Sequence, residues 1–369
     1  MNDLPGHDSE GHDSAGASGG TRTRPTTRDD HRVTTHAFTS TDGLPLTLLN
    51  VRGRHEPTRG PVLLVHGAGV RAEIFRPPTS RTFVDALIDD GWDVWLLNWR
   101  ASIDLDPVPW TLDAAAEHDH PAAVRTVAEL TGADTMKAVV HCQGSTSFAM
   151  SAAAGLVPQV TTIVSNAVSL HPVIPLGSRV KIHGLRPLIS GLTPGLDPSW
   201  GDDPDSAFGK VASRAVRLTH RECDNTVCRL VSFTYGSGRP ALWSHAQLDE
   251  ATHEWIRGEF GMAPMSFFAQ MDRCVRAGHL VSVTEGSGLP TDFGVTPPQT
   301  DARWVLVAGR DNRCFLPESQ ERTFAWLDRW QPGRHALHVV ENYGHLDIFL
   351  GERAHRDVFG MLLDELARD

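Results

Sequence analysis

Residues 136–150 read MKAVVHCQGSTSFAM, and this stretch decides the fold. Its first half is a short apolar run of the kind found in a strand that is buried on both faces of a parallel sheet. Small residues follow from Gly144 onward and predict a helix. A strand and a helix joined so closely need a sharp turn, and Cys142 stands at its apex.

Strands and helices alternate on both sides of this stretch, which predicts a doubly wound, mostly parallel sheet of the α/β class. Strands are expected within residues 60–69, 92–100, 160–169, 302–309 and 335–345, and helices within 82–91, 114–132, 319–330 and 355–368. Alternating residues around a DG pair in residues 35–53 predict an antiparallel hairpin at the start.

The alternation lapses in the middle of the chain, which indicates an insertion in one catalytic sheet. We expect residues 33–174 and 291–369 to form the α/β core, with residues 175–290 as a mostly helical lid. Residues 1–32 are rich in Gly, Ser, Asp, Thr and His, so we expect a disordered tail there.

The charge, the apolar runs and the cysteine content of the chain disfavour several classes of protein. The net charge of -11 and the pI of about 5.9 disfavour nucleic-acid binding, which needs a basic surface. There is no signal-like N-terminus and no apolar run of about 18 residues, so no membrane span is expected. The five cysteines lack the spacing of a disulfide scaffold and favour a cytoplasmic protein with reduced thiols. The sequence leaves the oligomeric state open.

Cys142 is the candidate nucleophile, because its surroundings fit the strand-turn-helix motif usually written G-x-S-x-G. A thiol at a helix N-terminus beside an imidazole can ionise well below the value of about 8.5 for a free thiol. Ser145 is the nearest alternative, but it lies inside the helix and points elsewhere. Two plainer interpretations remain: a buried cysteine of no special function, and a degenerate, inactive site.

The general base is expected after the last strand, in the chain order nucleophile, acid, histidine. His345 occupies this position in VVENYGHLDIF. The acid that orients the imidazole is expected in the loop after the preceding strand, where Asp311 and Asn312 are neighbours. Asp311 is preferred, although cysteine enzymes also tolerate an asparagine in this role.

An oxyanion hole needs two backbone N–H groups near the nucleophile. Gln143, the residue after Cys142, supplies the first candidate. The second is expected in the HGAG loop that follows the first buried strand, where Ala68 is preferred and Gly69 is the alternative.

With these residues placed, the sequence resembles the acid-lipase branch of the α/β-hydrolases in VLLVHG, GWDVWLLNWR, TLDAAAEHDHPAAV and GHLDIFLG. It is more similar to the hydrolase domains fused to glucose-methanol-choline oxidoreductases of the cholesterol-oxidase type, in HCQGSTSFAMS, CDNTVCRLVSFTYG, LDEATHEWIRGEFG and GRDNRCFLPES. The resemblance spans about residues 36–366. It implies an α/β-hydrolase with a lid, whose nucleophile and histidine match Cys142 and His345, acting on a hydrophobic, ester-like substrate.

No cofactor is expected, because the chain has no G-x-G-x-x-G fingerprint for a flavin or dinucleotide. Cys223 and Cys228 form a C-x4-C pair, but no second ligand pair follows at zinc-finger spacing, so we expect structural thiols and no metal. The leading hypothesis is hydrolysis of an ester, thioester or lactone of a hydrophobic small molecule through an acyl-Cys142 intermediate. Acyl transfer through the same intermediate, and a catalytically inactive binding protein, are the alternatives.

Overall fold

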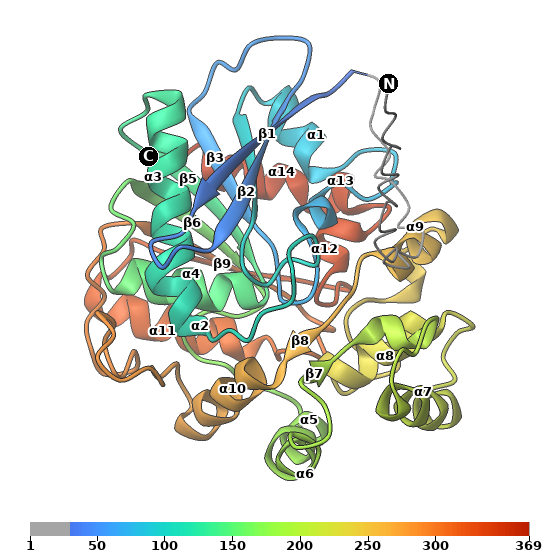
Figure 1. The fold of residues 1–369 in the computed structure, drawn as a ribbon. Coiled ribbons are helices and arrows are strands. Elements are labelled where there is room, and N and C mark those ends of the chain that lie inside the picture. The colour runs from blue at the N-terminus through green and yellow to red at the C-terminus, as the bar shows by residue number, and fades with distance from the viewer. Residues whose placement is uncertain (1–29, 369) are drawn as a thin grey trace, which may run out of the picture.

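The structure, a computed structural model, describes residues 30–368 and contains within them a sheet of eight strands (Figure 1). In spatial order the strands are β1 (Arg32–Thr39), β2 (Pro45–Arg52), β4 (Asp93–Asn98), β3 (Pro61–Val65), β5 (Met136–His141), β6 (Val160–Asn166), β9 (Arg303–Gly309) and β10 (Ala336–Val340). From β4 to β10 all neighbours pair in parallel, whereas β1 and β2 form the antiparallel hairpin predicted around the DG pair. The predicted doubly wound sheet is confirmed.

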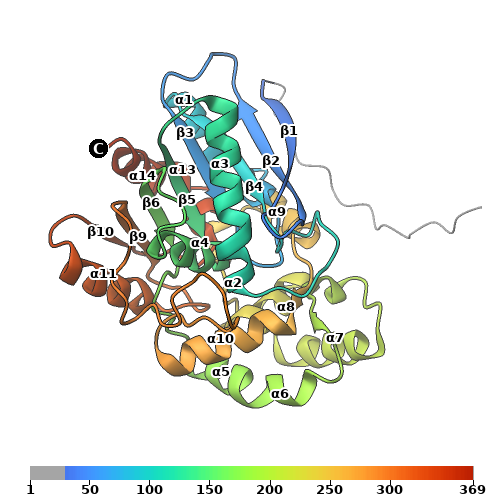
Figure 2. The same cartoon turned by 60° about the vertical axis from the view of Figure 1, so that its left-hand side comes forward.

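Helices cover both faces of the sheet (Figure 2). The elements of this core are η1 (Ala72–Phe75), α1 (Phe83–Asp89), α2 (Leu112–Ala114), η2 (Ala115–Asp119), α3 (His120–Thr131), α4 (Gln143–Ala153), α11 (Glu318–Trp330), α12 (Asp347–Leu350), α13 (Ala354–Asp357) and α14 (Phe359–Leu366). On one face α3 packs beside α4. On the other, α1 contacts α14 through the rings of Phe83 and Phe359.

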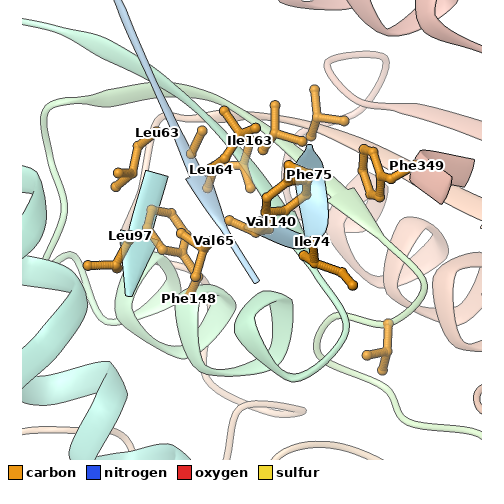
Figure 3. Close-up of a cluster of buried hydrophobic side chains, with 14 of the residues drawn as sticks. Leu63, Leu64, Val65, Ile74, Phe75, Leu97, Val140, Phe148, Ile163 and Phe349 are labelled. Atoms are coloured by element: carbon orange, nitrogen blue, oxygen red, sulfur yellow. The ribbon is translucent and has the colours of Figure 1, made fainter. Parts of the chain in front are cut away.

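The apolar core surrounds β3, whose five residues are all buried. Figure 3 shows Phe148 of α4 on one side of this strand and the rings of Phe75 and Phe349 on the other. These two rings meet edge to face with their centroids 5.1 Å apart. Burial on both faces explains why β3 is a continuous apolar run rather than an alternating pattern.

Between β6 and β9 the chain leaves the sheet and forms a largely helical segment, here called the insertion (residues 175–290). Its elements are α5 (Leu176–Val180), η3 (Lys181–Leu185), α6 (Arg186–Ile189), β7 (Gly195–Leu196), η4 (Pro198–Gly201), α7 (Ala207–Thr219), α8 (Thr226–Tyr235), η5 (His245–Gln247), α9 (Glu250–Trp255), η6 (Ile256–Gly258), β8 (Ala263–Pro264) and α10 (Met265–Ala277). In Figures 1 and 2 most of these helices gather at one end of the sheet.

Two expectations concern the chain outside this core. Most of the expected tail, residues 1–29, lies outside the described residues, and β1 begins at Arg32, inside the range assigned to the tail. Within the described part of the chain, no helix combines the length and apolarity needed to cross a bilayer.

A buried ion-pair network joins the hairpin to the core. The guanidinium of Arg100, at the end of β4, donates to Asp119 at 2.7 and 2.9 Å and to Asp42 in the hairpin turn at 2.9 Å. The Asp119 side chain is fully buried, and it also accepts the backbone N–H of Arg100. Removing Asp119 would therefore leave the buried guanidinium with only the partly exposed Asp42 as its ion-pair partner.

We predict that Asp119→Ala lowers the free energy of unfolding by about 3–5 kcal/mol, because Arg100 would lose its buried partner. Urea unfolding followed by circular dichroism measures this loss. The matched control is Glu341→Ala, which removes a carboxylate from the exposed Arg310 pair and should cost less than about 1 kcal/mol. Equal losses in the two variants would contradict the assigned importance of the buried network.

Candidate active site

Cys142 occupies a strained turn between β5 and α4. Its backbone has φ 56° and ψ -126°, a region that non-glycine residues adopt at a cost of about 1–3 kcal/mol. A Cβ on Gly144 would lie 2.2 Å from the carbonyl oxygen of His66, so this position accepts only glycine. The turn places the thiol at the N-terminus of α4, where the helix dipole favours a negative charge.

The loop after β3 passes directly over the thiol. A Cβ on Gly67 would lie 2.8 Å from Cβ of Cys142 and 3.2 Å from its Sγ. Ser145, the alternative nucleophile, points away, since its hydroxyl donates to the carbonyl oxygens of Cys142 and Val168. The structure thus presents Cys142, and not Ser145, at the apex of the turn.

His345 follows β10 and comes together with Cys142. One ring nitrogen from each of His141 and His345 and Sγ of Cys142 lie within 4.8 Å of one another. The Nδ1 of His345 accepts a hydrogen bond from Nδ2 of Asn312 at 3.2 Å. Its Nε2 is buried and has no other hydrogen-bond partner among residues 30–368, so it is the ring atom left for Cys142.

Asn312, and not Asp311, contacts the histidine, which corrects the preferred assignment. Asn312 is 1% exposed, and its Oδ1 accepts the backbone N–H groups of Cys314 at 2.9 Å and Phe315 at 3.0 Å. Asp311 is exposed, with its own N–H bonded to the carbonyl oxygen of Tyr343. The tight turn after β9 sends these adjacent side chains in different directions.

The two backbone donors fix the orientation of the Asn312 amide. Because Oδ1 is occupied by them, Nδ2 faces the imidazole, and an amide nitrogen can only donate. The Nδ1 atom of His345 must then be an acceptor, so the proton of the neutral ring is on Nε2. A carboxylate at this position would select the opposite tautomer.

Cys314 is a site residue that sequence reasoning missed. It is 2% exposed and its thiol is hydrogen-bonded to Cys142. Burial raises the pKa of Cys142, but the hydrogen bond from Cys314, the neighbouring His345 ring and the N–H of Gln143 together hold this pKa well below its usual value. Burial and the adjacent Cys142 raise the pKa of Cys314, so Cys314 remains a thiol and acts as donor.

The proposed oxyanion donors lie beside the thiol. Gln143 is the first residue of α4, directly after Cys142, and its backbone N–H lowers the pKa of the cysteine. The N–H of Gly69 is used by the carbonyl oxygen of Ala101 at 3.1 Å, which removes the alternative donor. Ala68 remains the candidate, and its carbonyl oxygen accepts the hydroxyl of Tyr235 at 3.3 Å.

The insertion binds the segment that carries His345 (residues 341–347), here called the histidine loop, through several hydrogen bonds. The carbonyl oxygen of Leu242 accepts the N–H groups of His345 at 3.0 Å and Leu346 at 2.8 Å. Asp347 is fully buried, and its carboxylate accepts the N–H of Gly344 at 2.6 Å and that of Ser244 at 3.0 Å. Burial raises the pKa of Asp347 to about 7 despite these hydrogen bonds.

An apolar pocket that is partly open to solvent lies beside Cys314 and Gln143. Its walls come mainly from the insertion, and the apolar lining residues are Ile174, Ile182, Leu185, Ile189, Leu196, Phe233, Tyr235, Met265, Phe267, Phe268, Met271, Val275 and Phe315. Two cationic groups, Lys181 and Arg186, also line it. A mostly apolar lining with a few polar groups is typical of sites that bind small molecules.

Metal-ligating atoms gather at two places among the described residues. The first place is formed by His141, Cys142 and His345. Both rings already have an asparagine amide at Nδ1: Nδ2 of Asn166 lies 3.0 Å from His141, and Nδ2 of Asn312 contacts His345. The second group, Cys223, Cys228, His245 and His253, lies in the insertion. The sequence indicated only its C-x4-C pair.

The parallel sheet, the strained cysteine turn and the histidine loop together define a protein with the α/β-hydrolase fold. No family model matches the chain. Triacylglycerol lipase 1 of Arabidopsis thaliana is 25% identical over 363 residues, which cover 89% of this chain and 86% of the lipase.

Solved structures share the fold at lower identity. An esterase from Thermogutta terrifontis superposes with a TM-score of 0.54 at 13% identity, over 91% of this chain and 100% of the esterase. A bacterial membrane phospholipase A superposes with a TM-score of 0.51 at 15% identity, over 91% of this chain and 87% of that protein.

We predict that Cys314→Ala moves the pH profile of Cys142 alkylation upward by roughly one to two pH units, because the thiolate loses a hydrogen-bond donor. Iodoacetamide labelling, with the modified peptide quantified by mass spectrometry, measures this for Cys142 alone. Cys274→Ala is the control, since this thiol is buried in α10 and contacts Val281 instead. A Cys142 profile that does not change in Cys314→Ala would contradict the assigned hydrogen bond.

Proposed function

We propose that this protein hydrolyses an ester or thioester of a hydrophobic acyl group through an acyl-Cys142 intermediate. The observation that carries the proposal is the position of Cys142: a strained turn at a helix N-terminus, where Cys314, His345 and the N–H of Gln143 favour the thiolate. A buried cysteine of purely structural function would need none of these partners.

The reaction has two steps. In the first, the Cys142 thiolate attacks the carbonyl carbon, the N–H groups of Gln143 and Ala68 stabilise the oxyanion, and the leaving group departs. In the second, water attacks the acyl-cysteine and gives its proton to His345, and the thiolate is released with the free acid. Acyl transfer would replace water by another nucleophile in this second step.

The pocket and the comparisons support a hydrophobic substrate. The walls of the pocket beside Gln143 and Cys314 are mostly apolar, and the proteins similar to this chain include a triacylglycerol lipase and an esterase. A long acyl group would bury apolar surface against the insertion at about 25 cal/mol per Å².

We assign the insertion as a lid over this site, because it supplies most of the pocket wall. The segment from α5 to α6 is apolar on two sides: Ile182 and Ile189 line the pocket, while Leu176 and Leu188 are 77% and 75% exposed. Exposed leucines beside a substrate pocket suit a segment that meets lipid or an aggregated substrate.

The tautomer of His345 restricts which kinds of leaving group can depart in the first step. With the proton on Nε2 and an amide donor on Nδ1, the ring presents no free lone pair toward the substrate. The first step therefore suits leaving groups that depart as stable anions, such as thiolates and phenolates. The second step needs the opposite tautomer, so we expect it to be slow and the acyl-enzyme to accumulate.

We predict that Cys142→Ala abolishes turnover of p-nitrophenyl octanoate and that the wild-type protein gives a burst of p-nitrophenolate, because acylation precedes a slower hydrolysis. Intact-mass spectrometry of the quenched reaction should find the octanoyl adduct, mapped to Cys142 by peptide analysis. Cys142→Ser should retain weak activity at best, and Cys274→Ala is the matched control.

Three outcomes of this experiment separate the candidate functions. Turnover by Cys142→Ala equal to that of the wild type would refute the assigned nucleophile. An adduct that is released only when an alcohol, amine or thiol is added would identify an acyltransferase. A protein that never forms an adduct with an ester or a thioester would fit a binding protein.

We predict that Asn312→Asp accelerates hydrolysis of the acyl-enzyme by about 10-fold or more, because a carboxylate accepts from Nδ1–H, frees Nε2 as a base and stabilises the imidazolium. The variant keeps the two backbone hydrogen bonds to Oδ1. Single-turnover release of the octanoyl adduct measures the rate. Asp311→Asn is the control, because Asp311 is the exposed neighbour, and it should change the rate of adduct release less than about twofold. A larger effect of Asp311→Asn would indicate that Asp311, and not Asn312, orients the histidine.

A further inference from the structure

Four side chains of the insertion converge on one point. Cys223 precedes α8, Cys228 lies in its first turn, His245 lies in η5 and His253 lies in α9. Each offers one nitrogen or sulfur atom, and the four atoms all lie within 4.8 Å of one another. Sγ of Cys228 is 3.4 Å from Nε2 of His245, and the two imidazole rings have centroids 4.9 Å apart.

The surrounding backbone holds these side chains in place. Asn225 caps α8 by accepting the N–H of Cys228 at 3.0 Å, and its Nδ2 donates to the carbonyl oxygen of His253 at 2.6 Å. One side chain thus ties the cysteine-bearing helix to the histidine-bearing helix. The arrangement is fixed by hydrogen bonds outside the cluster, as second-shell groups do around metal sites.

We propose that Cys223, Cys228, His245 and His253 bind one Zn²⁺ ion at a closed, structural site. Two thiolates and two imidazoles are a donor set that zinc prefers, and four protein ligands complete its tetrahedral shell. No coordination position is left for substrate or water, so the ion stabilises the insertion and takes no part in the acyl chemistry.

Unpartnered polar atoms around the cluster point to a missing cation. Among residues 30–368, Nε2 of His253 and both carboxylate oxygens of Glu222 are buried without a hydrogen-bond partner. Buried polar atoms are seldom left unpaired. Zinc would coordinate the imidazole, and its charge would compensate the Glu222 carboxylate next to Cys223.

The indole of Trp243 agrees with this site. The buried Nε1 of Trp243 lies beside Cys228, where an N–H group can donate to a metal-bound thiolate.

The position of the site explains what zinc would stabilise. His245 directly follows Ser244, whose N–H is bonded to Asp347 in the histidine loop. Beyond α9 the chain reaches Glu259, which pairs with Arg71 at 2.6 Å, close to the loop that carries Ala68. The ion would thus hold the part of the insertion that contacts both the histidine loop and the loop after β3 that carries Ala68.

The test uses the full-length protein, stripped with a chelator, incubated with Zn²⁺ and dialysed. Inductively coupled plasma mass spectrometry should find about one zinc per chain. Replacing zinc with Co²⁺ should give the visible bands of tetrahedral cobalt and a thiolate-to-cobalt charge-transfer band. Chelation should lower the Tm by roughly 5 °C or more.

Variants locate the ion. Cys223→Ala and His253→Ala should lose the bound zinc and the cobalt spectrum, whereas the matched controls Cys274→Ala and His55→Ala should keep both. If these variants fail to fold, the stoichiometry and cobalt spectrum of the wild-type protein still decide the question. No retained metal, a cobalt spectrum without sulfur ligation, or a Cys223–Cys228 disulfide in a non-reduced peptide map of the metal-free protein would each overturn the proposal.

Discussion

The left-handed backbone at Cys142 is the constraint on which the rest of the site depends. It exists because β5 and α4 meet in one tight turn, and Gly144 packs its α-carbon against the carbonyl of His66. The same close approach puts the loop after β3 over the thiol, through Gly67. The Cys142 thiol, the N-terminus of α4 and the loop after β3 are therefore positioned by one packing requirement, and the buried strands β3 and β5 hold the strained turn in place.

The insertion takes part in the architecture of the site as well as in covering it. Leu242 and Ser244 bind the histidine loop through backbone hydrogen bonds, and Tyr235 and Glu259 reach the loop after β3. A movement of the insertion would thus shift both His345 and the loop that carries Ala68. Under the proposed function, these contacts would couple substrate binding under the insertion to the positions of the proposed catalytic groups.

The sequence was sufficient for the sheet and for the positions of Cys142 and His345, because these follow from local signals: apolar runs, a turn with an obligatory glycine, and chain order. It was insufficient for Asn312, since the direction of a loop side chain depends on which backbone N–H groups it meets. Cys314, and the approach of His245 and His253 to the Cys223–Cys228 pair, were missed for a related reason. Their partners lie on separate elements, and no periodicity or short spacing connects them.

Two differences from a serine hydrolase fit together: a cysteine stands at position 142, and an asparagine, Asn312, contacts the histidine. A serine at position 142 would need a base with a free Nε2, and hence Nδ1–H held by a carboxylate. Asn312 donates to Nδ1 and so selects the other tautomer. A thiol tolerates this loss, because Cys314, the N–H of Gln143 and the neighbouring ring already favour its anion. In the proposed mechanism the chemistry therefore depends less on proton transfer to the histidine and more on a thiol that is ionised before the substrate arrives, so that activation of water, and not attack by Cys142, is the demanding step.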